Sequence, residues 1–315
     1  MEFFELTAAD IAALDDGQLR ELVARLAEAE LKGQGLPSSS VHAGGAQEAA
    51  DGGIDVQVEV HGVLTAPNFV PRADTGFQVK KHSMGRASCK KEMLENGAIR
   101  QSIKALVNVK GAYIIVSGKD SCSATMHADR IAGMEEALGD LPEDHGLALD
   151  FYGNDRLALW LKQHPGVALW VRQQLGKTLA GWRPYGRWAA TPRYDDDTFL
   201  ADPHPCVTDG SSRDKISKPV LDGIELTRQR LRAGDRAVRI TGLSGVGKTR
   251  FAQALFEPSV GEEALPATDV LYADLGEELE PSASSVVGYL IANKLTPYVV
   301  LDNCPPGVHR ALQKQ

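Results

Sequence analysis

The sequence has little cysteine and no long apolar run. Its 315 residues include four cysteines, and no two of them form a C-x-x-C pair. Dispersed cysteines of this kind offer no cysteine-based zinc site and are typical of a reducing cytoplasm. No stretch comes near the roughly 18 consecutive apolar residues that a membrane-spanning helix needs. The opening residues, MEFFELTAAD, lack a basic segment followed by an apolar core. We therefore expect no signal peptide, no membrane partner and a cytoplasmic location.

The chain also lacks an excess of positive charge. The formal net charge is −8, with 43% hydrophobic and 24% charged residues. An acidic total argues against a protein coated all over with nucleic acid, but it leaves room for a local basic groove. The composition is that of a globular protein, and the length suggests about two domains.

Hydrophobic patterning predicts an α/β domain in residues 1–175. We expect a helix over 16–32 whose first turn carries a capping box formed by Asp15 and Gln18. The apolar run AYIIVS, bounded by Gly111 and Gly118, is typical of a fully buried strand. The other elements expected in this domain are strands at 54–60, 76–80 and 147–152 and helices at 99–109, 155–163 and 167–175.

The composition changes after residue 175. Residues 176–215 hold Gly, Pro, Trp and Asp but few periodic apolar positions, so we expect a linker. This linker need not be disordered, because Trp182, Tyr185 and Trp188 could dock it onto a neighbour. A second domain, again α/β, is expected over 216–315.

Residues 242–249, GLSGVGKT, are a P-loop. Residues 238–241 (VRIT) are expected to form the strand before it, and a helix is expected to start near Arg250, which is the order that the motif requires. The glycines let backbone N–H groups surround a phosphate. Lys248 would neutralise phosphate charge, and the hydroxyl of Thr249 would hold Mg²⁺. A chance glycine loop is the alternative.

A P-loop site also needs a carboxylate for the metal. Residues 298–301 (YVVL) are expected to form a strand, with Asp302 at its carboxyl end, where α/β sheets bind ligands. A turn or cap role for Asp302 is the alternative. The residues that we expect to hold the nucleotide are Gly242, Gly245, Val246, Gly247, Lys248, Thr249, Arg250 and Asp302, with Thr249 and Asp302 at the metal.

The stretch GLSGVGKTRFAQALF, followed by YVVLDNC, resembles the NTPase core of the STAND class of signal-transduction ATPases. The resemblance implies ATP and Mg²⁺ as cofactors and a parallel-sheet fold in which nucleotide acts as a switch. Asn303 stands where many members have a second acid, which puts fast hydrolysis in doubt. Such a domain needs further strands, a sensor residue and a lid, so we expect the P-loop NTPase domain to be incomplete and the chain to be part of a longer protein.

A second constellation lies near the start of the chain, at 51–56 (DGGIDV) and 76–81 (GFQVKK). If strands 54–60 and 76–80 are neighbours, Asp55 lies near Gln78 and Lys80, which share one face of their strand. Asp55 and the Gln78 carbonyl oxygen would ligate Mg²⁺, and Lys80 would orient water or stabilise charge on a phosphate. This is a workable phosphodiesterase site.

These residues resemble the PD-(D/E)xK restriction-endonuclease fold, in an Mrr-like variant with Q-x-K. Related nucleases often place a Glu on the first helix, which makes Glu30 a further catalytic candidate, although a charge at the fraying end of the helix is the alternative. Glu59 and Gln101 are either further site residues or solvated side chains. Lys and Arg residues between Thr75 and Lys91, with His82, suit a phosphate backbone, or they form a solvated loop.

The combination resembles a bacterial antiviral defence protein. It implies an Mg²⁺-dependent DNA endonuclease that cuts double-stranded DNA and assembles into a homo-oligomer, a tetramer, when ATP is bound. It also implies a viral protein as trigger, bound by a C-terminal sensor that this sequence lacks. A translocating restriction motor would need helicase motifs that are not seen in 215–315. A scaffold whose first domain only binds nucleic acid or mediates assembly is the non-enzymatic alternative.

Overall fold

The computed structural model describes residues 3–43, 52–66, 68–139, 141, 145–189, 206–210 and 214–315. The chain divides into two units, Met1–Thr178 and Leu179–Gln315. Both combine helices with a sheet, so the α/β class is confirmed. Across the described ranges, no helix has both the length and the apolar character needed to cross a membrane.

A mixed sheet lies at the centre of the first unit, in the strand order β1-β2-β3-β6-β7. Strand β2 is antiparallel to β1 and β3, whereas β6 runs parallel to β3 and β7. The expected strand at 112–117 is confirmed as β6, which is buried along its whole length. The strands of this unit are Val41–Ala43 (β1), Val56–Glu59 (β2), Asp74–Lys80 (β3), Leu94–Glu95 (β4), Ala98–Ile99 (β5), Ala112–Ser117 (β6) and Ala148–Tyr152 (β7).

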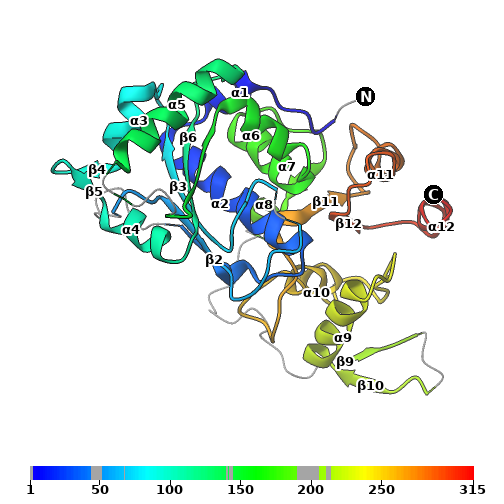
Figure 1. Cartoon of the computed structure of the whole chain (residues 1–315). Helices are drawn as coiled ribbons and strands as arrows, with labels where there is room; N and C mark the ends of the chain where they lie inside the picture. Colours follow the sequence, from blue (N-terminus) through cyan, green and yellow to red (C-terminus); the bar gives the residue numbers. More distant parts are fainter. Residues whose placement is uncertain are drawn as a thin grey trace, which may run out of the picture. The chain divides into compact units, whose positions relative to one another are not determined.

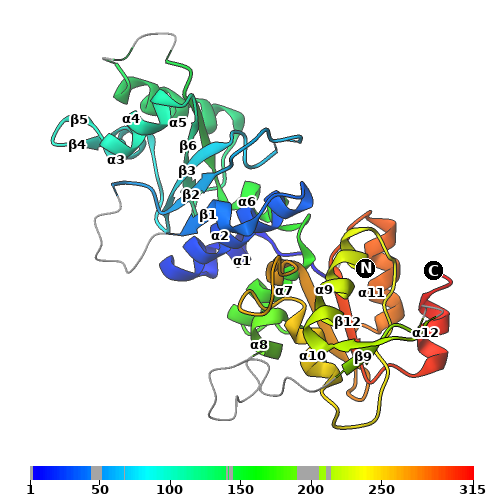
Figure 2. The ribbon, with the colours of Figure 1, turned by 90° about the horizontal axis from the view of Figure 1, so that it is seen from below.

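Helices cover both faces of this sheet (Figures 1 and 2). On one face, Phe77 of β3 and Tyr152 of β7 pack against Trp160 of α6. On the other, Tyr113 and Ile115 of β6 share a core with residues of α3, α4 and α5. The helices are Ala8–Ala13 (α1), Asp16–Gly33 (α2), Arg86–Glu92 (α3), Gln101–Asn108 (α4), Ala124–Ala137 (α5), Asn154–Leu161 (α6) and Pro165–Gln174 (α7), and Ser38–Ser40 form a short 3-10 turn, η1.

Helix α2 begins as the sequence predicts. The Asp15 carboxylate accepts from the Gln18 N–H at 2.8 Å, and the Gln18 amide oxygen accepts from the Asp15 N–H at 2.9 Å. This capping box satisfies N–H groups that the first turn leaves without partners. The apolar stripe of the helix, including Leu19, Leu22 and Leu26, is buried.

The second unit has a smaller sheet in the order β12-β11-β8. Strand β12 is parallel to β11, and β8 is antiparallel to β11. Its elements are Trp182–Pro184 (β8), Tyr185–Ala189 (α8), Cys206–Thr208 (β9), Ser217–Pro219 (β10), Val220–Arg232 (α9), Lys248–Ala254 (α10), Ala267–Asp269 (η2), Val270–Asp274 (β11), Ala283–Ala292 (α11), Tyr298–Asp302 (β12) and Pro306–Leu312 (α12).

Part of the segment expected as a linker belongs to this second unit. Strand β8 pairs with β11, and the Trp182 indole N–H donates to the Pro281 carbonyl oxygen at 2.8 Å. Trp188 is buried and stacks on Tyr272 with a centroid distance of 4.5 Å. The aromatic residues of the segment therefore dock it, as the sequence suggested. Residues 190–205 and 211–213 of the expected linker lie outside the described residues.

The strand expected at 238–241, before the P-loop, is wrong: no described strand pairs with these residues, and they form none. A short segment with β-branched residues becomes a strand only when a neighbouring strand satisfies its backbone groups. Helix α10 does follow the P-loop, beginning at Lys248.

A buried arginine fixes the far end of α10. The side chain of Arg228, from α9, is 1% exposed, and within the described residues it donates only to backbone carbonyl oxygens. Two of these carbonyls, at Ala254 and Leu255, lie at the last turn of α10. A cation at a helix C-terminus faces the negative end of the helix dipole, so Arg228 holds α10 by charge as well as by hydrogen bonds.

Candidate functional site

Asp55 lies where β2 and β3 separate. The Asp55 N–H donates to the Phe77 carbonyl oxygen at 2.8 Å, but on the other side the ladder is completed by the side chain. Oδ2 of Asp55 accepts from the Val79 N–H at 2.7 Å. Val56 pairs with Phe77, so one further step along the register sets Asp55 opposite Gln78. The structure therefore brings the carboxylate to the Q-x-K stretch, as the two-strand hypothesis required.

The turn before Asp55 is anchored from two other elements. Gly52 and Gly53 have φ of 62° and 86°, a left-handed conformation that favours glycine. Their carbonyl oxygens accept from the Ser102 hydroxyl of α4 at 2.5 Å and from the Tyr113 hydroxyl of β6 at 3.2 Å. Asp51, the first residue of the motif, lies outside the described residues.

The buried amide oxygen of Gln78 is free to bind a ligand. Its side chain is 3% exposed, and no described residue donates to its amide oxygen, Oε1. A buried acceptor without a donor is costly, whereas a hard cation such as Mg²⁺ is bound by oxygen ligands of this kind. Gln78 alternates with Phe77 and Val79, so it shares a strand face with Lys80.

Lys80 is held by an acid that the sequence hypothesis missed. Its ammonium lies 3.0 Å from the Glu92 carboxylate, at the end of α3. Glu92 is twelve positions after Lys80, separated from it by a loop and a helix, so no local spacing points to the pair. This ion pair fixes the ammonium of Lys80, which lies on the same strand as Gln78.

Asp55 also has a cationic neighbour that the sequence hypothesis missed. Nε of Arg20, on α2, lies 3.1 Å from Oδ1 of Asp55, and the same guanidinium contacts Asp16 at 2.6 Å. Arg20 therefore compensates the charge of a carboxylate that is 5% exposed.

Glu30 does not join Asp55. It is 7% exposed, and its Oε1 accepts from the Val70 N–H at 2.8 Å in the loop before β3. It lies ten residues beyond Arg20 on α2, or about 15 Å along the helix axis. Burial raises the pKa of the Glu30 carboxyl. The expectation that Glu30 faces the site with Asp55 and Lys80 is therefore corrected. Glu30 is buried because its carboxylate accepts a hydrogen bond from the loop before β3.

The remaining candidates are at the surface or already paired. Glu59 is exposed and accepts from the Gln57 amide at 2.6 Å, and Gln101 is exposed on the first turn of α4. In the basic segment, Arg86 and Lys90 are bound to Glu136 of α5. The exposed basic residues Lys81, His82 and Lys91 form no ion pair with the part of the chain that the structure describes.

Few side chains near Asp55 could bind a metal ion. In the described residues, no three His, Cys, Asp or Glu side chains lie close enough together to hold a metal ion. Magnesium commonly keeps several waters and uses only one or two carboxylates. Asp55 with the Gln78 amide oxygen is compatible with that pattern.

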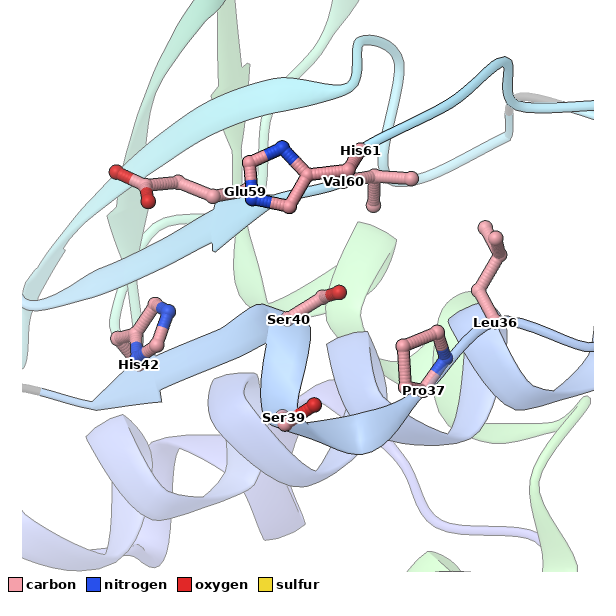
Figure 3. A pocket seen from close by; sticks show the side chains of 8 residues that line it. All are labelled: Leu36, Pro37, Ser39, Ser40, His42, Glu59, Val60 and His61. Carbon is pink, nitrogen blue, oxygen red and sulfur yellow. The ribbon is translucent and has the colours of Figure 1, made fainter. Parts of the chain in front are cut away.

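A surface cavity of the first unit lies apart from these residues. It is about 360 Å³ in volume and is lined by η1 with its preceding loop, by β1 and by the end of β2 (Figure 3). His42 and Glu59 come from these neighbouring strands. None of the expected catalytic residues lines it, so it is not the site built around Asp55.

In the second unit, the P-loop and β12 meet. Gly245 and Gly247 have φ of 80° and 87°, which a side chain would disfavour. The Thr249 hydroxyl donates to Oδ2 of Asp302 at 2.5 Å, so the two residues expected at the metal are in contact. The Lys248 ammonium donates to the Leu243 carbonyl oxygen at 2.7 Å, across the loop that it would serve.

The other expected nucleotide residues surround this contact. Gly242 begins the loop, and a Cβ there would lie 3.1 Å from a methyl carbon of Val246. Val246 is 57% exposed, and Arg250 contacts the Gln253 amide at 3.4 Å within α10. The loop is exposed as a whole, unlike the site around Asp55.

Comparison with known proteins adds no further constraint. No protein-family model matches the chain, and no curated protein or solved structure matches it. The assignment of both sites therefore depends on the motifs and on the geometry described above.

Proposed function

We propose that the first unit is an Mg²⁺-dependent DNA endonuclease and that the second unit binds a nucleoside triphosphate that regulates it. The observation that carries the first assignment is the hydrogen bond from the Val79 N–H to Asp55. It fixes a buried carboxylate against the strand that carries Lys80 and Gln78, and the Gln78 amide oxygen receives no hydrogen bond from the described residues.

The residues have separable roles. Asp55 and the Gln78 amide oxygen would hold the metal, which supplies Lewis-acid polarisation of the phosphodiester and a more acidic water when bound. Lys80, kept in position by Glu92, stabilises negative charge that develops on the phosphate oxygens or orients the attacking water. The turn contacts from Ser102 and Tyr113 preorganise Asp55.

The substrate class follows from charge near the site. Lys81 directly follows Lys80 and is exposed, and Lys91 is exposed one residue before Glu92. Exposed lysines suit the phosphate backbone of double-stranded DNA and would make binding depend on salt. Because Arg86 and Lys90 are paired with Glu136, the surface available to a backbone is smaller than the sequence count suggests.

The second unit supports nucleotide binding through the contact of Thr249 with Asp302. Lys248 would leave the Leu243 carbonyl and pair with phosphate oxygens, and Thr249 with Asp302 would hold Mg²⁺. Together with a nuclease, such a unit suits an ATP-dependent switch in antiviral defence, in which assembled copies cut DNA after a viral protein is sensed.

Plasmid cleavage with Mg²⁺, with and without ATP, tests the nuclease. Asp55→Asn keeps an oxygen that can accept from the Val79 N–H but removes the charge, and we expect cleavage to fall by at least about 100-fold. Lys80→Gln should act in the same direction. Glu59→Gln, at an exposed position of β2, is the matched control. Wild-type cleavage by Asp55→Asn would refute the assignment.

Binding of a fluorescent ATP analogue tests the second unit. Lys248→Ala should weaken binding by about 100-fold or more, because the loop loses its phosphate-pairing charge. Lys218→Ala, an exposed lysine of the same unit, is the control. Equal affinity of the two variants would contradict the nucleotide site.

A non-catalytic first unit is the second candidate. It is favoured by the ion pairs of Asp55 with Arg20 and of Lys80 with Glu92, since both charged groups already have structural partners. This candidate predicts that DNA is bound, that it is not cut, and that Asp55→Asn leaves binding unchanged.

A further inference from the structure

A second carboxylate lies beside Asp302. Strands β11 and β12 are parallel neighbours whose last residues, Asp274 and Asp302, are in register. The carboxyl ends of parallel strands are where α/β folds bind ligands. The two carboxylates therefore emerge side by side at the sheet edge to which Asp302 brings the P-loop residue Thr249.

Asn303 holds this second carboxylate. Its side-chain amide donates to Oδ1 of Asp274 at 2.7 Å, and the Gly276 N–H donates to the same oxygen at 2.8 Å. Asn303 has φ of 49°, a left-handed conformation that asparagine tolerates better than most residues. No described residue donates to Oδ2 of Asp274, so this oxygen is left to accept from a molecule outside the chain.

The two acids have different surroundings. Asp302 is engaged on the loop side, with the Thr249 hydroxyl at 2.5 Å and the Tyr272 hydroxyl at 3.4 Å. Asp274 is engaged by an amide and a backbone N–H, neither of which belongs to the P-loop. Asp302, in contact with Thr249, is thus placed to bind the metal, and Asp274 is placed to accept a proton.

We propose that Asp274 is the proton acceptor for hydrolysis of the nucleoside triphosphate at the P-loop, positioned by Asn303. The inference depends on the nucleotide site proposed above and extends it from binding to catalysis. Asn303 carries an amide, which cannot take a proton, whereas Asp274 beside it carries a carboxylate that can.

The step balances without a further reactant. The oxygen of a water molecule forms a bond to the γ-phosphorus, and the bond from that phosphorus to the β–γ bridging oxygen breaks. The bond electrons leave with the nucleoside diphosphate. One water proton passes to Oδ2 of Asp274 and is later released with inorganic phosphate or to solvent.

A purely structural role for Asp274 makes a different prediction. An aspartate at the end of a strand can also close a local turn, as the Gly276 contact does. In that case Asp274→Asn, whose amide oxygen still accepts, should leave hydrolysis unchanged. A proton acceptor loses its function in the same variant, because the amide cannot take the proton.

An exchange of the two side chains tests the proposal in the full chain. Phosphate release from ATP with Mg²⁺ is measured for wild type, Asp274→Asn and the double variant Asp274→Asn/Asn303→Asp. Binding of the fluorescent ATP analogue and thermal unfolding are measured in parallel. We expect Asp274→Asn to lose at least about 100-fold in rate with unchanged nucleotide affinity. The double variant keeps one carboxylate and one amide in contact and should recover to within about 10-fold of wild type.

The outcomes separate this inference from the function on which it depends. A rate for Asp274→Asn within about threefold of wild type overturns the inference, as does a wild type that binds ATP without hydrolysing it. Failure of the double variant to recover would show that a carboxylate within this pair is not sufficient as the proton acceptor, and it also overturns the inference. If Lys248→Ala does not reduce binding, the nucleotide site itself is wrong.

Discussion

The two candidate sites differ in how the chain holds them. Around Asp55 and Gln78, side chains that are at most 5% exposed are fixed by a packed sheet with helices on both faces. Around Thr249 and Asp302, an exposed loop and a half-buried strand meet through single polar contacts. A buried site is positioned by packing before its ligand arrives, whereas an exposed one depends on hydrogen bonds and on the ligand itself.

The largest expected effect tests the polar side of this contrast. Arg228→Met keeps much of the side-chain volume but removes the buried guanidinium from five backbone carbonyl oxygens, two of them at the end of α10. We expect the second unit to lose about 3–5 kcal/mol of stability. Hydrogen exchange of α10 peptides is the measurement, because it reports on one unit of a chain that has two.

Arg232→Met, at a half-exposed position of the same helix, is the control. If α10 exchanges at the wild-type rate in Arg228→Met, then polar contacts do not dominate this unit, and the contrast with the first unit disappears.

The next effect tests the interior of the first unit through pH. His164 precedes α7, and burial lowers its pKa from 6.5 to about 4. The unfolded chain therefore binds a proton between pH 6.5 and 4 that the folded chain does not. Stability should fall as the pH drops through that window, by up to about 3 kcal/mol. Hydrogen exchange of α7 at pH 7 and pH 4.5 compares wild type with His164→Gln.

The difference in stability between the two pH values should shrink in His164→Gln and persist in His42→Gln, where the histidine is exposed. If the difference in stability between the two pH values is unchanged in His164→Gln, then protonation of His164 does not destabilise the first unit.

A smaller effect examines the buried site itself. Glu92→Gln keeps the shape at Lys80 but removes the charge that fixes the ammonium. We expect cleavage to fall by about 10–100-fold, as for other residues that orient a catalytic group. Glu95→Gln is the matched control from the nearby exposed strand β4. Full activity in Glu92→Gln would mean that packing alone positions Lys80.

The smallest effect concerns Glu30. Burial raises the pKa of the Glu30 carboxyl, which means that the folded chain disfavours its charged form. Glu30→Gln preserves an acceptor for the Val70 N–H without a charge, so we expect the variant to be more stable than wild type at pH 8, by a margin that diminishes toward pH 4. Chemical denaturation of the first unit checks the gain, and loss of cleavage in this variant would restore Glu30 to the catalytic set.

Local patterns predicted those features that depend on near neighbours. The buried strand at 112–117 is an apolar run between glycines, and the capping box needs only Asp15 and Gln18. The proximity of Asp55 to Gln78 followed from two adjacent strands. The buried position of Glu30 was not predicted, because the Val70 N–H that it accepts from lies forty residues away, and nothing in the helix indicates that contact.

Contacts between distant elements could not be predicted in this way. Glu92 reaches Lys80 from the end of a helix, and Asp274 reaches Asn303 from another strand. The strand expected at 238–241 does not form, for a related reason. A strand needs a neighbouring strand to pair with, and the pattern of one segment does not show whether such a partner exists. Tertiary pairing decides such features, whereas propensity decides helices and caps.

The bond from the Val79 N–H to Asp55 has a further consequence for how the first unit matures. The carboxylate takes the place of a main-chain carbonyl in the ladder, so the sheet is not complete at this point until the side chain is seated. Folding of the sheet and placement of the Asp55 carboxylate are then one event. Under the proposed function, a newly made chain would acquire this part of the site when the sheet closes, and control over cleavage would have to come from elsewhere in the protein.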